Sequence, residues 1–439
     1  MTYFWLALAF VGAAAVAGAA FARSTTAAPA IAAGGTQRGD AERDGTAKGP
    51  SAAHWRAVGL AFAALAVLTA VFDSVMIGME LFHYDEAHLL GAKIGLAPLE
   101  DFAYPLAAVL LLPGLWLWLT RRTAAQTDAA TPEGARDSVR PNPPDPSGSR
   151  PAGLLSQAIL ASRPVSWINT AYPFAAAMLL TTREIDWVLV VGTFYFLIPY
   201  NLAMYGINDV FDYASDLQNP RKGGIEGALL PPRLHRPMLW LAVITNVPFL
   251  VVLAFAGGPA AWISLAVSAF AVVAYSVAGL RFKERPLVDS MTSSTHFVSP
   301  AVVGLALAGA DVTAGLLILL AAFFVWGMAA HAFGAVQDIV PDRQAGIGSI
   351  ATVIGARATV RLAVVLWLLA GLAMLATPWP GPLAAVVALP YVANCAPWWN
   401  VTDTTAARTN KAWRRFIWLN YGSGFLVTLI LILQWSLSS

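Results

Sequence analysis

Long apolar blocks follow one another along almost the whole chain, and most are roughly 18–25 residues long, close to the ~20 that a helix needs to cross a bilayer. The blocks show no period-two alternation, which argues against a membrane β-barrel. Charged residues make up 12% of the 439 residues, about half the usual share of roughly 25%. Because so few charges cannot coat a soluble globule of this size, the sequence predicts an all-α polytopic membrane protein.

Two polar stretches interrupt the blocks and define the predicted domains. Residues 23–51 predict a flexible loop, and residues 122–152 predict a cytoplasmic linker because the run RPNPPDPSGSRP cannot bury a core. About three transmembrane helices are expected in the domain at 1–121, near residues 4–22, 56–80 and 102–120. Nine are expected in the domain at 153–439, near residues 165–182, 187–207, 237–256, 260–280, 291–310, 314–335, 362–376, 382–399 and 416–435.

The distribution of basic residues predicts the topology. Loops after the odd-numbered helices of the second domain carry only Arg183, whereas those after the even-numbered helices carry Arg221, Lys222, Arg233, Arg236, Arg281, Lys283, Arg285, Arg343, Arg357, Arg361, Arg408, Lys411, Arg414 and Arg415. Cytoplasmic loops are enriched in Lys and Arg, so we expect a multi-pass cell-membrane protein with its even loops in the cytoplasm. The net charge of +2 shows no excess of basic residues of the kind that binds nucleic acid.

Acidic residues gather on the same predicted side. The segment NDVFDYASD places Asp209, Asp212 and Asp216 at i, i+3 and i+7, and DIVPD places Asp338 and Asp342 at i and i+4. Carboxylates at a membrane edge repel one another unless a cation lies between them. Mg²⁺ prefers carboxylate, water and phosphate oxygens, so the pattern predicts a magnesium site. Taken alone, either segment could equally be a helix end or a solvated loop.

A basic segment, YSVAGLRFKERP, lies between the acidic ones and contains Arg281, Lys283 and Arg285. Carboxylates, Mg²⁺ and cationic side chains together predict a diphosphate site. At the bilayer border an allylic diphosphate fits best, because a water-poor pocket would protect its carbocation. Four ring-bearing residues near the motifs either pack in the core or face the cation and the proton-loss step: Tyr205, Tyr275, Trp326 and His331.

The motifs resemble those of a known family. NDVFDYASD is similar to the NDxxDxxxD motif of the UbiA superfamily of intramembrane prenyltransferases, and YSVAGLRFKERP is similar to its Tyr-Ser…Lys loop. DIVPDRQAGIGSIAT resembles its second Asp motif, with Val340 where many members carry an acid. The resemblance covers residues 153–439 and implies nine helices with the motifs facing the cytoplasm. It implies metal ligation by Asp209, Asp212, Asp216, Asp338 and Asp342, and diphosphate or substrate binding by Asn208, Tyr275, Arg281, Lys283 and Arg343.

The first domain resembles the three-helix subunits of heterodimeric lycopene cyclases, with PLEDFAY at 98–104 similar to their Pro-x-Glu-acid signature. Glu100 and Asp101 either cap the N-terminus of the following helix, where the helix dipole favours negative charge, or include an acid of raised pKa that protonates an alkene. Asp73 is a second candidate, because intramembrane acids are usually functional. Such cyclases work as pairs, so a separate second subunit is implied.

A cyclase-like part joined to a prenyltransferase part resembles the lycopene elongases. The resemblance implies Mg²⁺-dependent transfer of a dimethylallyl group from dimethylallyl diphosphate to the ends of lycopene. The new cation would then lose a proton or capture water. A UbiA-type transferase for a quinone or another lipid, or a non-catalytic scaffold of a carotenoid pathway, are the alternatives.

Overall fold

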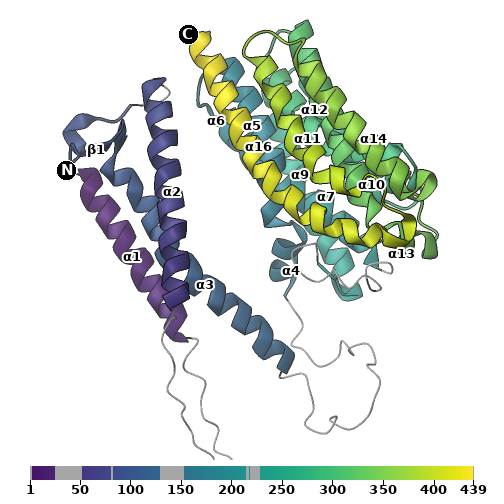
Figure 1. Cartoon of the computed structure of the whole chain (residues 1–439), viewed down its shortest axis with the longest axis horizontal. Helices are drawn as coiled ribbons and strands as arrows, with labels where there is room; N and C mark the ends of the chain where they lie inside the picture. The colour runs from purple at the N-terminus through teal and green to yellow at the C-terminus, as the bar shows by residue number, and fades with distance from the viewer. Residues whose placement is uncertain are drawn as a thin grey trace, which may run out of the picture. The chain divides into compact units, whose positions relative to one another are not determined.

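The computed structural model describes residues 2–24, 52–80, 83–128, 153–213, 217 and 228–438. The chain divides into two compact units, Met1–Pro151 and Ala152–Ser439, and each is taken by itself below (Figure 1). Most of the predicted loop at 23–51, the linker from residue 129 onward and Asp216 lie outside the described residues. Helices dominate both units, and the strands within the described part are two residues long, which confirms the predicted all-α class.

The first unit contains three long helices and a small hairpin. Its elements are α1 (Thr2–Ser24), α2 (Ala52–Gly78), η1 (Glu86–His88), β1 (Lys93–Ile94), β2 (Ala97–Pro98), η2 (Leu99–Phe102) and α3 (Ala103–Asp128). Strands β1 and β2 pair antiparallel, with Ile94 opposite Ala97. Helix α3 continues past the predicted linker boundary, because the sequence TRRTAAQT after residue 119 is rich in good helix formers.

Helices α1 and α3 approach closely at two glycines. A Cβ on Gly18 would lie 2.2 Å from the carbonyl oxygen of Leu110, and one on Gly114 would lie 2.4 Å from that of Gly18. Small residues at helix crossings allow this kind of backbone contact in membranes. The pair of helices therefore forms a tightly packed base for the acidic η2 turn that precedes α3.

The second unit is a helical bundle. Its elements are α4 (Leu154–Ala161), η3 (Pro164–Ser166), α5 (Ile168–Thr182), α6 (Trp187–Leu197), α7 (Pro199–Phe211), η4 (Pro232–Leu234), α9 (His235–Ala256), α10 (Pro259–Ser276), η5 (Phe282–Glu284), α11 (Val288–Leu307), α12 (Ala314–Val336), α13 (Ile339–Gln344), α14 (Ile350–Met374), η6 (Gly381–Val387), α15 (Ala388–Cys395), η7 (Ala396–Trp398), η8 (Asp403–Thr409) and α16 (Asn410–Leu437). Each of the nine predicted segments contains helix in this list.

Helix α7 starts at a break that the sequence pattern does not reveal. Pro199 lacks an N–H, so α6 ends at Leu197 and α7 begins after Ile198. The freed carbonyls of Phe196 and Leu197 accept hydrogen bonds from the Asn201 side-chain amide, at 2.9 and 3.1 Å. The break sets the direction of α7, which carries Asn208 and ends at Phe211 with Asp212 as its C-cap.

Helix α14 is longer than the predicted 362–376. It begins at Ile350 because Ser349 and Thr352 form a capping box. Gly355 bends the helix with φ +79° and ψ 164°, a conformation that is essentially restricted to glycine. Arg357 and Arg361, which the topology argument placed in a loop, therefore lie within α14.

Two apolar clusters hold the bundle together. One joins α12, α14, α15 and α16 around the buried rings of Phe333, Trp367 and Tyr391. The other joins α5, α6, α7, α9, α10 and α11 around Phe174 and Phe196. The space between these two halves holds the cavity described below.

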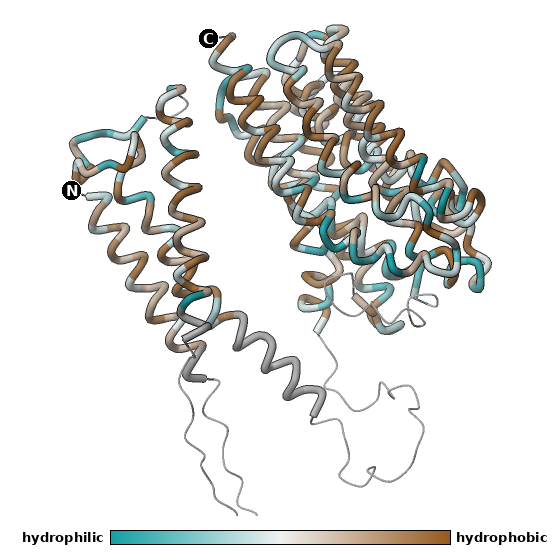
Figure 2. The backbone as a smooth tube through the Cα atoms, in the orientation of Figure 1, coloured by the Kyte–Doolittle hydropathy of each residue, from teal (hydrophilic) through white to brown (hydrophobic). Residues whose placement is uncertain are grey.

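Eight helical stretches in the described part are long and apolar enough to cross a membrane. Two of them lie in the first unit, Thr2–Phe21 and Arg56–Gly78. The third membrane crossing expected there, near residues 102–120, stays a prediction. The other six lie in the bundle. Figure 2 shows apolar residues along the helices and polar residues at their ends, as expected of a multi-pass membrane protein.

Candidate active site

A cavity of about 2080 Å³ runs through the bundle, about twice the upper volume of ordinary small-molecule pockets. Its wall follows the whole of α12, from Thr313 at one end to Asp338 just beyond the other. A helix of 23 residues spans about 35 Å, which matches the thickness of a bilayer core. The cavity is therefore large enough for a long apolar molecule.

One end of the cavity contains most of the predicted site residues. The residues that line this end are Asn208, Asp212, Tyr275, Arg281, Lys283, Asp338 and Asp342. They come from the end of α7, from the end of α10 and the loop that follows it, and from the segment after α12. The fold thus brings together three segments that are more than 50 residues apart in the chain.

Lys283 lies at the centre of this end. Its ammonium group donates hydrogen bonds to Asp212 Oδ1 and, at 3.2 Å, to Asn208 Oδ1. The Ser276 hydroxyl also donates to Asn208 Oδ1, at 3.0 Å. Burial lowers the pKa of Lys283, and the nearby Asp212 carboxylate opposes this shift. The ammonium is therefore held inside the cavity by its acidic partner.

The backbone of the basic loop is unusual. Arg281 has φ +40° and Gly279 has φ +91°, and this tight turn directs both Arg281 and Lys283 to the cavity. Arg281 donates to Glu284, and its NH2 lies 3.8 Å from Asp212 Oδ1. The hydrogen bond from Arg281 to Glu284 raises the pKa of the guanidinium further, so the group is always a cation.

The second acidic motif faces this basic loop. Asp338 is the N-cap of the short helix α13, and the Asp342 N–H donates to the Asp338 carbonyl at 2.9 Å, which places the two carboxylates one turn apart. Gly348 comes so close to the loop that an added Cβ would lie 2.7 Å from the Glu284 carbonyl oxygen. The two motifs are therefore packed against each other.

Two predicted residues are arranged differently, and a third lies outside the described residues. Asp209 is 1% exposed and does not line the cavity; its oxygens accept from Arg163 NH2 at 3.4 Å and from Ala228 N at 3.1 Å. Arg343 also lies off the cavity wall and donates to Asp403 and to the Thr352 carbonyl. Asp216 belongs to the part that the structure does not describe, so only Asp209 and Asp212 of the predicted helical triplet can be placed.

Arg163 is a site residue that the sequence analysis missed. It lines the cavity, its guanidinium lies 4.2 Å from the centre of the Tyr205 ring, and its buried Nε has no hydrogen-bond partner among the described residues. A buried unpartnered donor favours an anionic ligand. The available signal was an arginine directly before Pro164, just ahead of the helix expected near residues 165–182.

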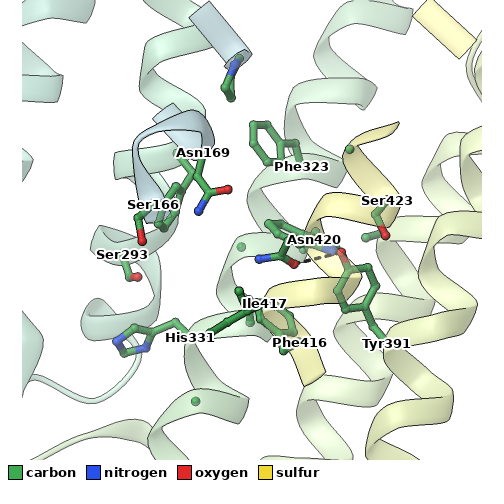
Figure 3. A pocket seen from close by; sticks show the side chains of 18 of the residues that line it. Ser166, Asn169, Ser293, Phe323, His331, Tyr391, Phe416, Ile417, Asn420 and Ser423 are labelled. Atoms are coloured by element: carbon green, nitrogen blue, oxygen red, sulfur yellow. Dashed lines mark hydrogen bonds between the residues drawn. The ribbon is translucent and has the colours of Figure 1, made fainter. Parts of the chain in front are cut away.

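The rest of the cavity is mainly apolar and aromatic, with a few polar groups. Figure 3 shows Asn169, Asn420 and Ser423 at its wall together with Phe323 and Phe416. The Tyr391 hydroxyl donates to Asn420 Oδ1 at 3.0 Å. The four ring-bearing residues singled out in the sequence, Tyr205, Tyr275, Trp326 and His331, all contribute to the wall.

A second group of acids lies in the first unit, at the η2 turn. Glu100 and Asp101 are 8% and 7% exposed. Glu100 Oε1 accepts from Leu90 N at 2.6 Å, and its buried Oε2 has no partner among the described residues. Asp101 accepts from the Tyr84 hydroxyl at 2.9 Å and is hydrogen-bonded to Asp73. Burial raises the pKa of Asp101 to about 6, so this carboxyl keeps its proton at mildly acidic pH, where an ordinary aspartate has lost it.

The geometry of the cavity suits an amphipathic substrate. Arginine and lysine side chains and two acidic segments at one end can hold a metal-bound diphosphate, and the aromatic chamber can hold an apolar chain and stabilise a nearby cation. This chemistry is group transfer from a lipid-like diphosphate.

Comparisons with known proteins agree with this chemistry. The chain is 49% identical over 405 residues to the C(50) beta-cyclic carotenoids biosynthesis protein LbtBC of Dietzia sp. (strain CQ4), covering 89% of this chain and 94% of that protein. It is 52% identical over 274 residues to a lycopene elongase/hydratase of Corynebacterium glutamicum, covering 62% of this chain and 96% of that protein. A UbiA homolog from Archaeoglobus fulgidus, solved bound to DMAPP and Mg²⁺, is similar at a TM-score of 0.43 and 18% identity, covering 61% of this chain and 98% of that one. Residues 170–420 match the model of the UbiA prenyltransferase family, and the chain therefore belongs to that family.

Proposed function

We propose that the second unit is a lycopene elongase, which transfers a dimethylallyl group from dimethylallyl diphosphate to the ends of lycopene. The observation that carries the proposal is the single cavity that joins a cationic, carboxylate-bearing end to an apolar chamber as long as a bilayer is thick. A short ring acceptor would leave most of that chamber unfilled, whereas a long polyene would fill it. The names of the relatives from Corynebacterium and Dietzia support the same acceptor.

We also propose that Mg²⁺ accompanies the diphosphate. Within the described residues no three His, Cys, Asp or Glu side chains lie close enough to hold a metal by themselves. Mg²⁺ commonly uses one or two carboxylates together with substrate phosphates and waters. Asp212, Asp338 and Asp342 line the same end of the cavity and provide such oxygens. When bound, the ion would neutralise charge on the leaving diphosphate.

The residues of the chain have distinct roles in this proposal. Lys283, Arg281 and Arg163 would bind the diphosphate oxygens and stabilise the charge that develops as the C–O bond breaks. Asp209, locked by Arg163 and Ala228, would hold the end of α7 in place. The apolar chamber would hold the allylic cation next to the terminal double bond of lycopene, which favours attack by that bond over hydrolysis.

For the first unit we propose a contribution to cyclisation of the carotenoid end groups. The η2 turn buries two carboxyl groups: Glu100, whose Oε2 has no partner among the described residues, and Asp101, whose pKa burial raises to about 6. A buried acid in an apolar setting is what alkene protonation requires. The relative from Dietzia, which matches 89% of this chain, is named for beta-cyclic carotenoids. A second cyclase-like subunit would act with this unit.

The topology proposed from the loop charges places the prenyltransferase motifs in the cytoplasm and the Glu100 turn on the outer side. Reporter fusions after residues 90 and 135 of the chain would test it, with signals expected on opposite sides of the membrane. Signals on one side would overturn the charge-based topology.

The elongase proposal is tested by producing the full chain in a bacterium that accumulates lycopene and analysing its pigments. Carotenoids with one or two added five-carbon units are expected, and Asp212→Ala should abolish them. Glu184→Ala, which removes an exposed carboxylate that lies off the cavity wall, is the control and should leave the products unchanged. If lycopene stays unmodified while a quinone or another lipid becomes prenylated, the acceptor assignment is wrong; if nothing is prenylated, a scaffold role gains support.

A further inference from the structure

A chain of polar side chains leads away from the diphosphate end of the cavity into the bundle. Tyr275 of α10 and His331 of α12 both line the cavity. The Tyr275 hydroxyl and His331 Nε2 are 3.2 Å apart, with the rings nearly perpendicular at 83°. On the other side of the imidazole, Nδ1 lies 3.1 Å from the hydroxyl of Ser290 in α11. Both ring nitrogens are thus held by hydroxyl groups from two other helices.

A buried carboxylate lies next to Ser290, at the end of this series of polar side chains. Asp289 is 0% exposed and precedes Ser290 in α11. Its oxygens accept from Ser290 N at 2.6 Å and from Ile350 N at 2.8 Å, which fixes it at the start of α14. A negative charge near the imidazole would stabilise a proton that reaches the ring during the reaction. Polar groups so placed inside a membrane bundle are expensive and usually functional.

The position along α12 matches the site of the chemistry. His331 lies seven residues before Asp338, which corresponds to about 10 Å along a helix. A five-carbon chain whose diphosphate lies at the acidic end would reach this level of the cavity. Figure 3 shows His331 on the side of the cavity that carries Ser293, across from Tyr391 and Ser423.

Building on the elongase function proposed above, we infer that Tyr275 and His331 form the proton exit of the reaction. The C–O bond of the allylic diphosphate breaks, the allylic carbon bonds to the terminal double bond of lycopene, and a tertiary cation forms on the adjacent carbon. The Tyr275 oxygen accepts a proton from that cation, or from a water that has added to it, while the Tyr275 proton passes to His331 Nε2. The C–H or O–H electron pair then completes the new double bond or hydroxyl, leaving an imidazolium ion and free diphosphate.

Other groups at this end are poorly suited to accept the proton. Lys283 and Arg281 are cations, and Asp212 accepts from Lys283. Asp338 and Asp342 belong to the acidic motif assigned above to the metal. The Tyr275–His331 pair is neutral before the step and lies directly on the wall of the chamber. Tyr275 is therefore a catalytic residue in this scheme, and His331 and Ser290 are positioning residues that receive and stabilise the proton.

The experiment separates ionisation from proton loss. Full-length protein in lipid nanodiscs containing lycopene receives Mg²⁺ and dimethylallyl diphosphate labelled with ¹⁸O at the bridging position. The rate of elongated product is measured together with scrambling of the label into non-bridging positions, which reports reversible ionisation. The variants are Tyr275→Phe and His331→Gln. The matched control is Thr295→Val, which removes a hydroxyl of the same α11 that lies off the cavity wall and donates to its own helix at Met291.

Tyr275→Phe and His331→Gln should form product about 100-fold more slowly, the usual contribution of a general base, while scrambling continues at the wild-type rate or faster. Thr295→Val should change neither rate.

Product formation within about threefold of wild type in both Tyr275→Phe and His331→Gln would overturn the inference and indicate that the diphosphate takes the proton. A parallel loss of product and scrambling with intact substrate binding would overturn it too, since that pattern indicates a role in cavity shape. If wild-type protein scrambles label but never elongates lycopene, the elongase proposal fails instead. Should His331→Gln not fold, Tyr275→Phe decides the outcome.

Discussion

Lys283 carries a positive charge that contacts Asp212 of the first acidic motif and would bind the diphosphate of the substrate. Its ammonium contacts Asp212 and Asn208 in the ligand-free protein and would exchange Asp212 for phosphate oxygens when substrate binds. Lys283→Gln keeps a donor but loses the charge. Because hydrogen bonds to charged groups contribute about 1.5–3 kcal/mol, kcat/KM for dimethylallyl diphosphate should fall roughly 10- to 100-fold. Lys411→Gln, an exposed lysine off the cavity, is the control, and equal effects in the two variants would contradict a specific role.

The pKa of Asp101 predicts whether cyclisation increases or decreases as the pH rises. Its folded-state pKa is raised to about 6 by burial, is lowered by the Tyr84 hydrogen bond and is raised by the charge of Asp73. The acid form is therefore present below about pH 6 and lost above it, and cyclisation that depends on this proton should decline as the pH rises through that value. Tyr84→Phe should move the midpoint up, and Asp73→Asn should move it down.

The carboxylic C=O stretch in difference infrared spectra measures this titration without relying on any activity. Asp101→Asn identifies the band, because it should remove it. A midpoint near 4 in wild type, or shifts of the opposite sign in the two variants, would show that the η2 acids are not coupled as the structure indicates.

At the scale of elements, the bend in α14 is held by contacts from far along the chain. The Asp403 carboxylate accepts from Ala356 N at 2.7 Å and from Arg343 NH1 at 2.6 Å. Gly355 has φ +79°, and an added Cβ would lie 3.2 Å from Asp403 Oδ1. Gly355→Ala should therefore destabilise the bundle by about 1–3 kcal/mol.

In a thermal unfolding experiment in detergent, this loss corresponds to a decrease of roughly 2–10 °C in the Tm. Gly422→Ala in α16 is the matched control, because a Cβ there meets open space and alanine favours helix. A Tm for Gly355→Ala equal to that of the control would mean that the glycine conformation is not required.

The elements also show what the sequence could and could not predict. Apolar blocks of bilayer length located the helices, and the spacing of acids and bases located the segments that meet at one end of the cavity. The break at Pro199 was hidden because the apolar pattern continues across it. The burial of Asp209, the pairing of Arg343 with Asp403 and the contribution of Arg163 depend on contacts between segments far apart in the chain. Spacing within one segment carries no information about such contacts.

At the scale of the whole molecule, one chain combines two units with separate acid clusters. The Corynebacterium relative matches 62% of this chain over 96% of its own length, so a close counterpart of the bundle exists as a separate protein. The buried contacts of each acid cluster come from its own unit: Tyr84 and Leu90 for the η2 acids, Lys283 and Asn208 for Asp212.

This independence predicts complementation between two full-length variants, neither of which makes the cyclic elongated product by itself. Glu100→Gln should elongate lycopene without cyclising it, and Asp212→Ala should do neither, because elongated substrate is missing. When the two variants are produced together in lycopene-accumulating cells with a cyclase partner supplied, cyclic elongated carotenoids should return, since product released by one chain can enter the other through the membrane. Pigment analysis of the single and paired strains measures this outcome. If the paired strain makes only uncyclised product while wild type cyclises, the intermediate must pass directly between the two units of one chain, and the fusion itself is part of the mechanism.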